Sequence, residues 1–245
     1  MLAPYRLDII ENCQICRVRP ARLFCSLFPK TLQAFDAIKC VTPYPKGAVL
    51  FVEGQMPSGI FVLCTGRVKM SASASDGKML VVRIAEPGEV LGLSATMSGK
   101  AYELTAETAE PCLINFVKRD YFLPFLKGHP DACFKVAEQL SEKYRVACDE
   151  ARWLGLKTTA DQRLAKLLLD WSRQNLECGK TERCLQLTLT QEEIAQLIGT
   201  TRMTVIRTFA AFKKQHILEG KGNTLVILNK SALMEIAGLE PNRVN

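Results

Sequence analysis

The sequence predicts an α+β chain with three parts: an N-terminal antiparallel β-roll, a long helix and a C-terminal winged helix-turn-helix. Three observations predict it. Short apolar runs separated by glycines fill residues 43–122, residues 131–154 contain neither glycine nor proline, and a helix start signal with helix-turn-helix spacing lies at 190–205. Closely spaced short strands favour an antiparallel roll or sandwich, and strands followed by helices favour the α+β class.

The composition is that of a globular protein. The chain has 245 residues, of which 48% are apolar and 23% charged, with a formal net charge of +7. This excludes a largely disordered or collagen-like chain, and the length favours two domains or one large one. The most apolar long stretch, 47–66, is interrupted by Glu53 and Pro57, and the N-terminus lacks the basic and apolar regions of a secretory signal. We therefore expect a cytoplasmic protein without membrane spans, divided into an N-terminal cysteine-containing segment (1–40), the β-roll (41–130), the long helix (131–157) and the C-terminal domain (158–245).

Three runs in the roll segment have the length and composition of strands, namely 48–52, 60–63 and 79–82. A hairpin turn is expected at 75–78, because Asp76-Gly77 supplies the positive φ values of a type I′ turn.

Residues 131–156 carry a narrow apolar stripe at spacings close to a heptad, with charged residues on much of the remaining surface. This pattern predicts a dimerisation seam, and the alternative is a helix packed on its own domain. A new helix is expected to begin at the capping box of Thr159 and Gln162, which marks the domain boundary. The stripe consists of Val136, Leu140, Ala147, Ala151 and Leu154.

A segment near the C-terminus has the spacing of a helix-turn-helix. Thr190 and Glu193 form a capping box that starts a short helix over 192–198. Ala195, Gly199 and Val205 follow at spacings of four and six residues. They supply a small residue at the helix crossing, a glycine for the turn and an apolar anchor on a second helix over 201–215. Residues 218–228 predict a β-hairpin wing.

The second helix carries the residues expected to read DNA. Between Thr200 and Gly222 there are five basic residues and one acidic residue, so positive charge is concentrated on the motif. Arginines near the start of a recognition helix reach guanine, and threonines suit phosphates or a thymine methyl. The alternative is a solvated helix face. The expected DNA-binding residues are Thr190, Thr200, Thr201, Arg202, Met203, Thr204, Arg207 and Lys221.

Ten cysteines and two histidines are an unusual balance for a cytoplasmic chain. Disulfides are not expected in a reducing compartment, so some cysteines are candidate ligands. Cys13, Cys16 and Cys25 lie within thirteen residues beside three arginines, whose charge favours the metal-binding thiolate. No second Cys-x2-Cys pair completes a zinc site, whereas an iron–sulfur cluster accepts a fourth thiolate from far away. The spacing leaves open a cluster or a chance grouping, and it names no fourth ligand. The other cysteines are expected in cores.

The order of these parts resembles the Crp/Fnr family of bacterial transcription regulators, and within it the oxygen-sensing fumarate-and-nitrate-reduction branch. The resemblance covers nearly the whole chain. It is carried by Cys13-Gln-Ile-Cys16, the segment from Cys25 into the roll, residues 106–112 and residues 159–165. It implies a jelly roll like that of cyclic-nucleotide-binding domains and a long helix that pairs two chains. It also implies a [4Fe-4S] cluster whose ligands are Cys13, Cys16, Cys25 and Cys112.

The resemblance implies a homodimeric activator that binds a palindromic site in double-stranded DNA and contacts RNA polymerase, with no membrane partner. Loss of the cluster would weaken dimerisation and DNA binding. Met203 stands where the family typically carries a glutamate that reads cytosine, so base preference is expected to shift, toward a thymine methyl. The cyclic-nucleotide branch holds the phosphate with an arginine. Residues 101–105 of this chain contain none, so no cyclic nucleotide is expected.

The sequence leaves two alternatives to an oxygen-sensing regulator. A Crp/Fnr-type regulator without a cluster would bind another effector in the roll, sense redox state through thiols or act constitutively. An iron–sulfur redox enzyme is the least favoured. The sequence shows no paired catalytic carboxylates, no Ser-His-Asp arrangement and no Gly-x-Gly-x-x-Gly loop, so the chain is not expected to be an enzyme.

Overall fold

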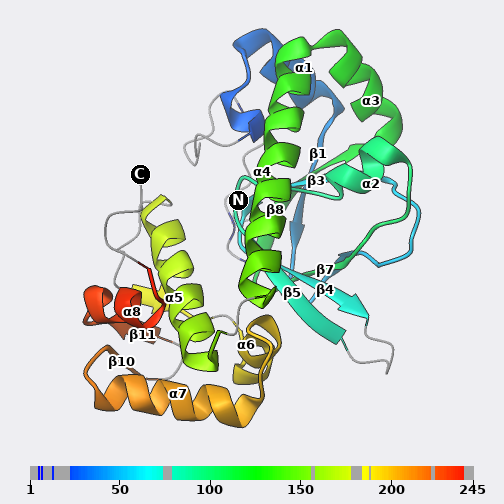
Figure 1. Ribbon diagram of the computed structural model, residues 1–245. Helices are drawn as coiled ribbons and strands as arrows, with labels where there is room; N and C mark the ends of the chain where they lie inside the picture. The colour runs from blue at the N-terminus through cyan, green and yellow to red at the C-terminus, as the bar shows by residue number, and fades with distance from the viewer. Residues whose placement is uncertain are drawn as a thin grey trace. The chain divides into compact units, whose positions relative to one another are not determined.

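The computed structural model describes residues 5, 7, 13, 23–73, 79–155, 158–177, 184–187, 189–221 and 224–239. The chain divides into two compact units, Met1–Cys148 and Asp149–Asn245 (Figure 1). The first holds strands and helices and the second is mainly helical, so the predicted α+β class is confirmed. Within the described ranges, no helix is both long and apolar enough to cross a membrane.

The N-terminal unit is a β-roll with short helices before, within and after its strands. The predicted runs 48–52, 60–63 and 79–82 fall on its second, third and fifth strands. Its elements are η3 (Leu23–Ser26), α1 (Pro29–Ile38), β1 (Cys40–Tyr44), β2 (Val49–Phe51), β3 (Gly59–Thr65), β4 (Val68–Ser73), β5 (Met79–Ala85), β6 (Val90–Leu91), α2 (Leu93–Ser98), β7 (Thr105–Thr108), β8 (Cys112–Lys118) and α3 (Arg119–Gly128).

The strands form two antiparallel four-stranded sheets, with orders β1-β8-β3-β6 and β2-β7-β4-β5. The predicted turn at 75–78 belongs to a stretch, 74–78, outside the described residues. The strands that flank it, β4 and β5, pair as a hairpin requires, from Ser73 opposite Met79 to Val68 opposite Ala85.

The β1-β8-β3-β6 sheet has two differently packed faces. Successive side chains of a strand point to opposite faces. Ile60 and Val62 of β3 therefore join the helices α1 and α3 in an outer core, and Phe61 and Leu63 face the second sheet. The roll interior is filled by a cluster that includes Tyr102, whose ring stacks on Phe51 at a centroid distance of 4.0 Å.

The long helix α4 (Pro130–Gly155) packs on its own domain at its start. Val136 is 2% exposed in the outer core, and Leu140 packs against the same core. These two side chains therefore face the roll of their own chain, as in the alternative that the sequence left open, and the seam stays a prediction for the rest of the stripe. Ala147 is exposed, whereas the side chains of Ala151 and Leu154 lie outside the described set. The exposed apolar side chains of α4 include Phe134 and Tyr144.

The C-terminal unit packs helices against a three-stranded antiparallel sheet of order β10-β11-β9. The predicted capping box at the start of its first helix is present: the Thr159 amide donates to Gln162 Oε1 at 2.9 Å, and the Gln162 amide donates to Thr159 Oγ1 at 3.2 Å. Its elements are α5 (Ala160–Glu177), β9 (Cys184–Gln186), α6 (Gln191–Leu197), α7 (Arg202–Lys214), β10 (Leu218–Lys221), β11 (Thr224–Ile227) and α8 (Lys230–Ile236).

Candidate functional site

The helices α6 and α7 form the helix-turn-helix that the sequence predicts. Thr190 caps α6 in a complete capping box with Glu193, and Thr201 caps α7 by accepting from the Thr204 amide at 3.2 Å. Between the helices, Gly199 has φ +62°, a left-handed conformation that glycine adopts without strain. Val205 is fully buried and anchors α7.

Arg163 of α5 fixes the turn of this motif. Its guanidinium donates to the carbonyl oxygens of Ile198 at 2.6 Å and Gly199 at 3.3 Å, and also to the carbonyl of Thr158 at 2.8 Å. The bonds to Ile198 and Gly199 satisfy carbonyls that the end of α6 leaves without intrahelical partners. Arg163 lies in a stretch that carries the family resemblance, but the sequence did not predict this role, because its partners in the turn lie 35 and 36 residues away.

A second contact ties the recognition helix to α5. Thr208 is 4% exposed, and its hydroxyl donates to the Asp161 carboxylate at 2.6 Å. At the other end of α7, Lys213 Nζ donates to the Gly220 carbonyl at 3.1 Å and so holds the wing hairpin. The recognition helix is thus bonded to the helix behind it and to the wing beside it.

Some of the predicted DNA-binding residues are exposed, whereas others use their side chains for contacts within the chain. Arg202, Met203 and Arg207 are exposed on α7, with Met203 at 55%. Thr200 and Thr204 are half-buried. The hydroxyls of Thr190 and Thr201 act as helix caps. Lys221 ends β10, and its side chain is outside the described set.

A groove of about 680 Å³ lies beside this motif, lined by residues of α6, α7 and the wing strands. Thr190 and Arg202 are on its wall. The groove therefore adjoins the face on which the sequence places the DNA contacts.

The thiol of Cys13 is held against the roll by a charged pair at the end of α1. Lys39 Nζ donates to Cys13 Sγ at 2.8 Å and lies 2.6 Å from the Asp36 carboxylate, which accepts from the Cys13 amide at 3.2 Å. Burial raises the pKa of the Cys13 thiol to about 11, although the Lys39 ammonium acts to lower it. Burial acts to lower the pKa of Lys39, but its bonds to Asp36 and Cys13 raise it above the usual value.

Asn115 of β8 connects Cys13 to another thiol. Its Nδ2 lies 3.2 Å from Cys64 Sγ and 3.9 Å from Cys13 Sγ. Cys64 was expected to be a core residue, so the sequence did not identify it as part of this site.

Cys112 lies elsewhere. It is fully buried among the residues of the roll interior, and its Sγ contacts the carbonyls of Glu110 at 3.2 Å and Arg67 at 3.3 Å. Burial, with the Glu110 carboxylate adding to it, raises the pKa of this thiol to about 12. Cys25 is half-buried in η3, and Cys16 lies outside the described residues. The described part of the chain holds no group of three or more His, Cys, Asp or Glu side chains placed to bind one metal ion.

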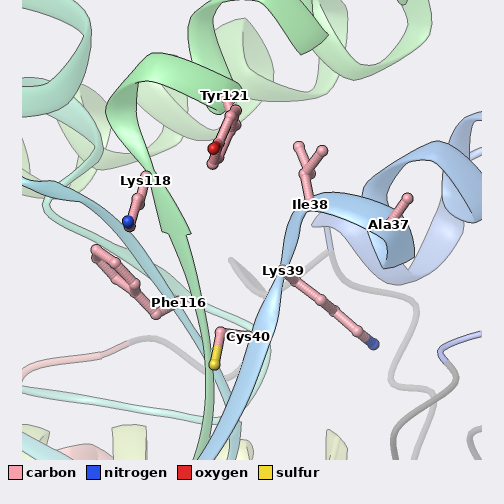
Figure 2. Close-up of a pocket in the computed structure, with 7 residues that line it drawn as sticks. All are labelled: Ala37, Ile38, Lys39, Cys40, Phe116, Lys118 and Tyr121. Atoms are coloured by element: carbon pink, nitrogen blue, oxygen red, sulfur yellow. The ribbon is translucent and has the colours of Figure 1, made fainter.

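A hollow of about 340 Å³ lies on the other side of Lys39 (Figure 2). Figure 2 shows the Lys39 side chain directed away from Lys118 and Tyr121, and this agrees with its bonds to Asp36 and Cys13. Lys39 therefore serves the Cys13 site. The hollow is lined by Ala37, Ile38, Lys39, Cys40, Phe116, Lys118 and Tyr121.

Comparison with known families assigns both parts of the chain. The family model of the cyclic nucleotide-binding domain matches residues 41–129, and that of the Crp-like helix-turn-helix domain matches residues 162–236. The chain belongs to the Crp/Fnr family and is a DNA-binding transcriptional regulator of that type.

Within the family, the chain is similar to regulators of the fumarate-and-nitrate-reduction branch. It is 28% identical over 233 residues to the transcriptional activator protein FnrA of Stutzerimonas stutzeri, covering 93% of each chain. It is 26% identical over 231 residues to the fumarate and nitrate reduction regulatory protein of Escherichia coli K12, covering 93% of this chain and 90% of that one. Among solved structures, FixK2 of Bradyrhizobium japonicum shares the fold with a TM-score of 0.73 at 24% identity, covering 81% of this chain and 97% of that one.

Proposed function

We propose that the chain is a homodimeric, redox-responsive transcription regulator whose signal enters at the N-terminal cysteines. The observation that carries this proposal is the position of Cys13. Its thiol is held on the roll by Lys39 and lies near Asn115, 102 residues further along the chain. A change at this cysteine would therefore act directly on the folded sensory domain. The similarity to regulators named for fumarate and nitrate reduction supports the same function.

The group we propose for these cysteines is a [4Fe-4S] cluster, which would supply oxygen-labile iron and requires four thiolates. Cys13 is half-buried, and its sulfur accepts a hydrogen bond from the Lys39 ammonium, which opposes the effect of burial on the pKa of the thiol. Of the implied ligands Cys13, Cys16, Cys25 and Cys112, Cys16 lies outside the described residues, and Cys13 and Cys112 pack in different cores of this structure. Cys112 lies in the roll interior, whereas Cys13 packs on the outer core across the sheet.

Helix α1 connects the Cys13 site to α4. Asp36 and Lys39, at and just beyond the end of α1, hold Cys13. Near its other end, the Thr31 hydroxyl donates to the Asp131 carboxylate in the first turn of α4 at 3.0 Å. Because a helix of ten residues moves as a unit, displacement of Cys13 would shift this contact and alter the start of α4.

We propose that the response is a change in DNA binding by a dimer. Two chains would pair through α4, whose exposed face includes Phe134 and Tyr144. Pairing would present two α7 helices to half-sites about 34 Å apart in a palindromic site. Arg202, Met203 and Arg207 would contact base edges. RNA polymerase is the further partner that the family implies, and no enzymatic activity is proposed.

We propose that the roll takes no cyclic nucleotide. Tyr102 fills its interior, with its hydroxyl bonded to the Gly59 carbonyl at 2.8 Å. The segment in which the cyclic-nucleotide branch carries an arginine has Glu103 instead, whose carboxylate accepts from the Ser94 hydroxyl at 2.7 Å. A carboxylate here would repel a phosphate.

One observation favours a second candidate function, a regulator without a cluster. Two thiols, Cys13 and Cys64, lie together around Asn115, and the described residues hold no group of three or more metal-binding side chains. Such a regulator would sense redox state through its thiols.

The test of the cluster is an assay of iron and acid-labile sulfide in anaerobically purified protein, with visible spectra before and after air exposure. We expect iron, sulfide and a visible absorption that air bleaches. Colourless protein without iron, prepared anaerobically and after incubation with ferrous iron and sulfide, would favour the cluster-free regulator.

A further inference from the structure

Thr208 is a polar residue on the otherwise apolar buried face of the recognition helix. The helix α7, which the structure describes along its whole length, buries Val205, Thr208, Phe209 and Phe212. Apolar packing is non-directional, so the valine and the two phenylalanines define the rotation of α7 less sharply than a hydrogen bond does. The Thr208 hydroxyl supplies this direction, because it donates to the Asp161 carboxylate at 2.6 Å, the length of a strong charge-assisted bond.

The burial of Thr208 alone does not require a carboxylate. A threonine inside a helix can bond its hydroxyl to the carbonyl of the residue four positions earlier, here Thr204, and so satisfy the buried group within the helix. In this structure the hydroxyl instead reaches a residue 47 positions away in another helix. The bond therefore determines how α7 lies against α5 rather than whether α7 forms.

Asp161 is itself held in a well-defined turn. It lies in the first turn of α5, which begins at the capping box described above, and a carboxylate is favourable at this positive end of a helix. Two residues further on, Arg163 bonds to the carbonyls of Ile198 and Gly199, just before α7 begins. One turn of α5 thus holds the recognition helix at two places, before its start and in its middle.

The exposed arginines of α7 lie between these two places. Arg202 begins the helix, and Arg207 directly precedes Thr208. Since successive residues of an α-helix point about 100° apart, a restraint on the direction of Thr208 also sets the direction of Arg207. A bidentate contact between an arginine and a guanine depends on that direction, so a small rotation of α7 would weaken it.

We infer that Asp161 is a positioning residue for DNA recognition, which acts through Thr208 on the direction of Arg207. Asp161 itself need not touch a base. Discrimination between DNA sequences then depends on a hydrogen bond at the buried face of α7. This inference rests on the proposed contact of Arg207 with a base edge, and it is independent of the group bound by the cysteines.

The test compares the affinity of the full-length protein for two duplexes of equal length and composition at one salt concentration, measured by fluorescence anisotropy. One duplex is selected from a random pool by the wild type, and the other carries a scrambled sequence. The ratio of the two affinities measures sequence discrimination, because the general attraction of the protein to DNA phosphates acts on both duplexes.

The variants either remove the bond or keep it. Asp161→Ala and Thr208→Val remove it, whereas Asp161→Asn keeps an acceptor and Thr208→Ser keeps a donor. Asp170→Ala is the matched control, because it removes a carboxylate of α5 that pairs with Lys166 at the surface. Arg207→Met reports the base contact itself, and circular dichroism checks the fold of each variant.

We expect Asp161→Ala and Thr208→Val each to lower the ratio by about tenfold, within the loss that one base contact produces, and their double variant to lower it no further. Asp161→Asn, Thr208→Ser and Asp170→Ala should keep the wild-type ratio. An unchanged ratio in folded Asp161→Ala or in folded Thr208→Val, while Arg207→Met loses discrimination, would limit the bond to a structural role and overturn the inference. A wild-type ratio in Arg207→Met would instead overturn the proposed base contact, and this inference with it.

Discussion

The Thr31 hydroxyl of α1 donates to the Asp131 carboxylate of α4 at 3.0 Å, and the Phe28 amide donates to the same carboxylate at 3.3 Å. Asp131 thus ties the first turn of the long helix to the helix whose other end holds Cys13. This carboxylate also lies near the positive end of the α4 dipole, where negative charge is favourable. The contact joins the proposed sensing site to the proposed dimer helix.

Asp131→Ala is expected to separate sensing from DNA binding. The variant loses two hydrogen bonds, each contributing about 1 kcal/mol, and should respond less to air than the wild type. Fluorescence anisotropy with a DNA duplex selected from a random pool by the anaerobic wild type measures the response. The control is Asp120→Ala, which removes a first-turn carboxylate from α3. An unchanged response in Asp131→Ala would exclude this contact as the route.

Arg163→Met is expected to weaken DNA binding although Arg163 is not one of the predicted DNA contacts. The substitution keeps the aliphatic stem but removes the donors to Ile198, Gly199 and Thr158, so the turn between α6 and α7 loosens. Charged hydrogen bonds contribute about 1.5–3 kcal/mol, and the partly buried position places the total loss of stability at about 2 kcal/mol. Urea denaturation and DNA titration measure both effects. Arg173→Met, at an exposed arginine of α5, should change neither.

Met203→Glu is expected to change base preference. A thioether accepts no useful hydrogen bond from a base, whereas a glutamate at this exposed position of α7 accepts from the cytosine amino group. Duplexes that differ at one base pair should then be discriminated by about 1–3 kcal/mol more in favour of the cytosine-containing site. Identical preferences in the two proteins would show that position 203 does not face a base.

The lowered pKa of Lys143 is expected to make the free energy of unfolding depend on pH. Burial, with the Arg83 guanidinium adding to it and Glu89 and Glu103 opposing it, lowers the pKa of Lys143 from 10.5 to about 8. Between these values the unfolded chain binds more protons than the folded protein, so the Lys143 contribution raises the free energy of unfolding as pH rises through this window. Lys143→Met removes that rise, and Lys135→Met, on the same helix, keeps it. Urea denaturation at several pH values measures the slope, and equal slopes for the wild type and Lys143→Met would contradict the shift.

The elements set by local signals were predictable from the sequence. The helix-turn-helix is defined by signals close together in the sequence: the capping box at Thr190, the glycine at position 199 and the spacing to Val205. The structure places each as expected. The strand runs were predictable because β-rich composition and glycine punctuation are local as well.

Features that depend on packing partners were not predictable. An apolar stripe on α4 looks the same whether it faces a second chain or its own roll, and only the structure shows Val136 in the outer core. The face on which a cysteine lies depends on strand register, and the pairing of β3 with β8 shifts between Leu63 and Thr65, on either side of Cys64. The sequence does not give that register, so it could not predict that Cys64 lies near Cys13 around Asn115.

The central claim is that the Cys13 site controls DNA binding. Its most direct test is the affinity of anaerobic and air-exposed protein for the selected duplex, measured for the wild type and for Cys13→Ala, with Cys133→Ser as the control. We predict that air weakens binding by the wild type and by Cys133→Ser, and that Cys13→Ala binds weakly under both conditions. Equal affinity with and without air in the wild type, or an unaltered response in Cys13→Ala, would contradict the claim.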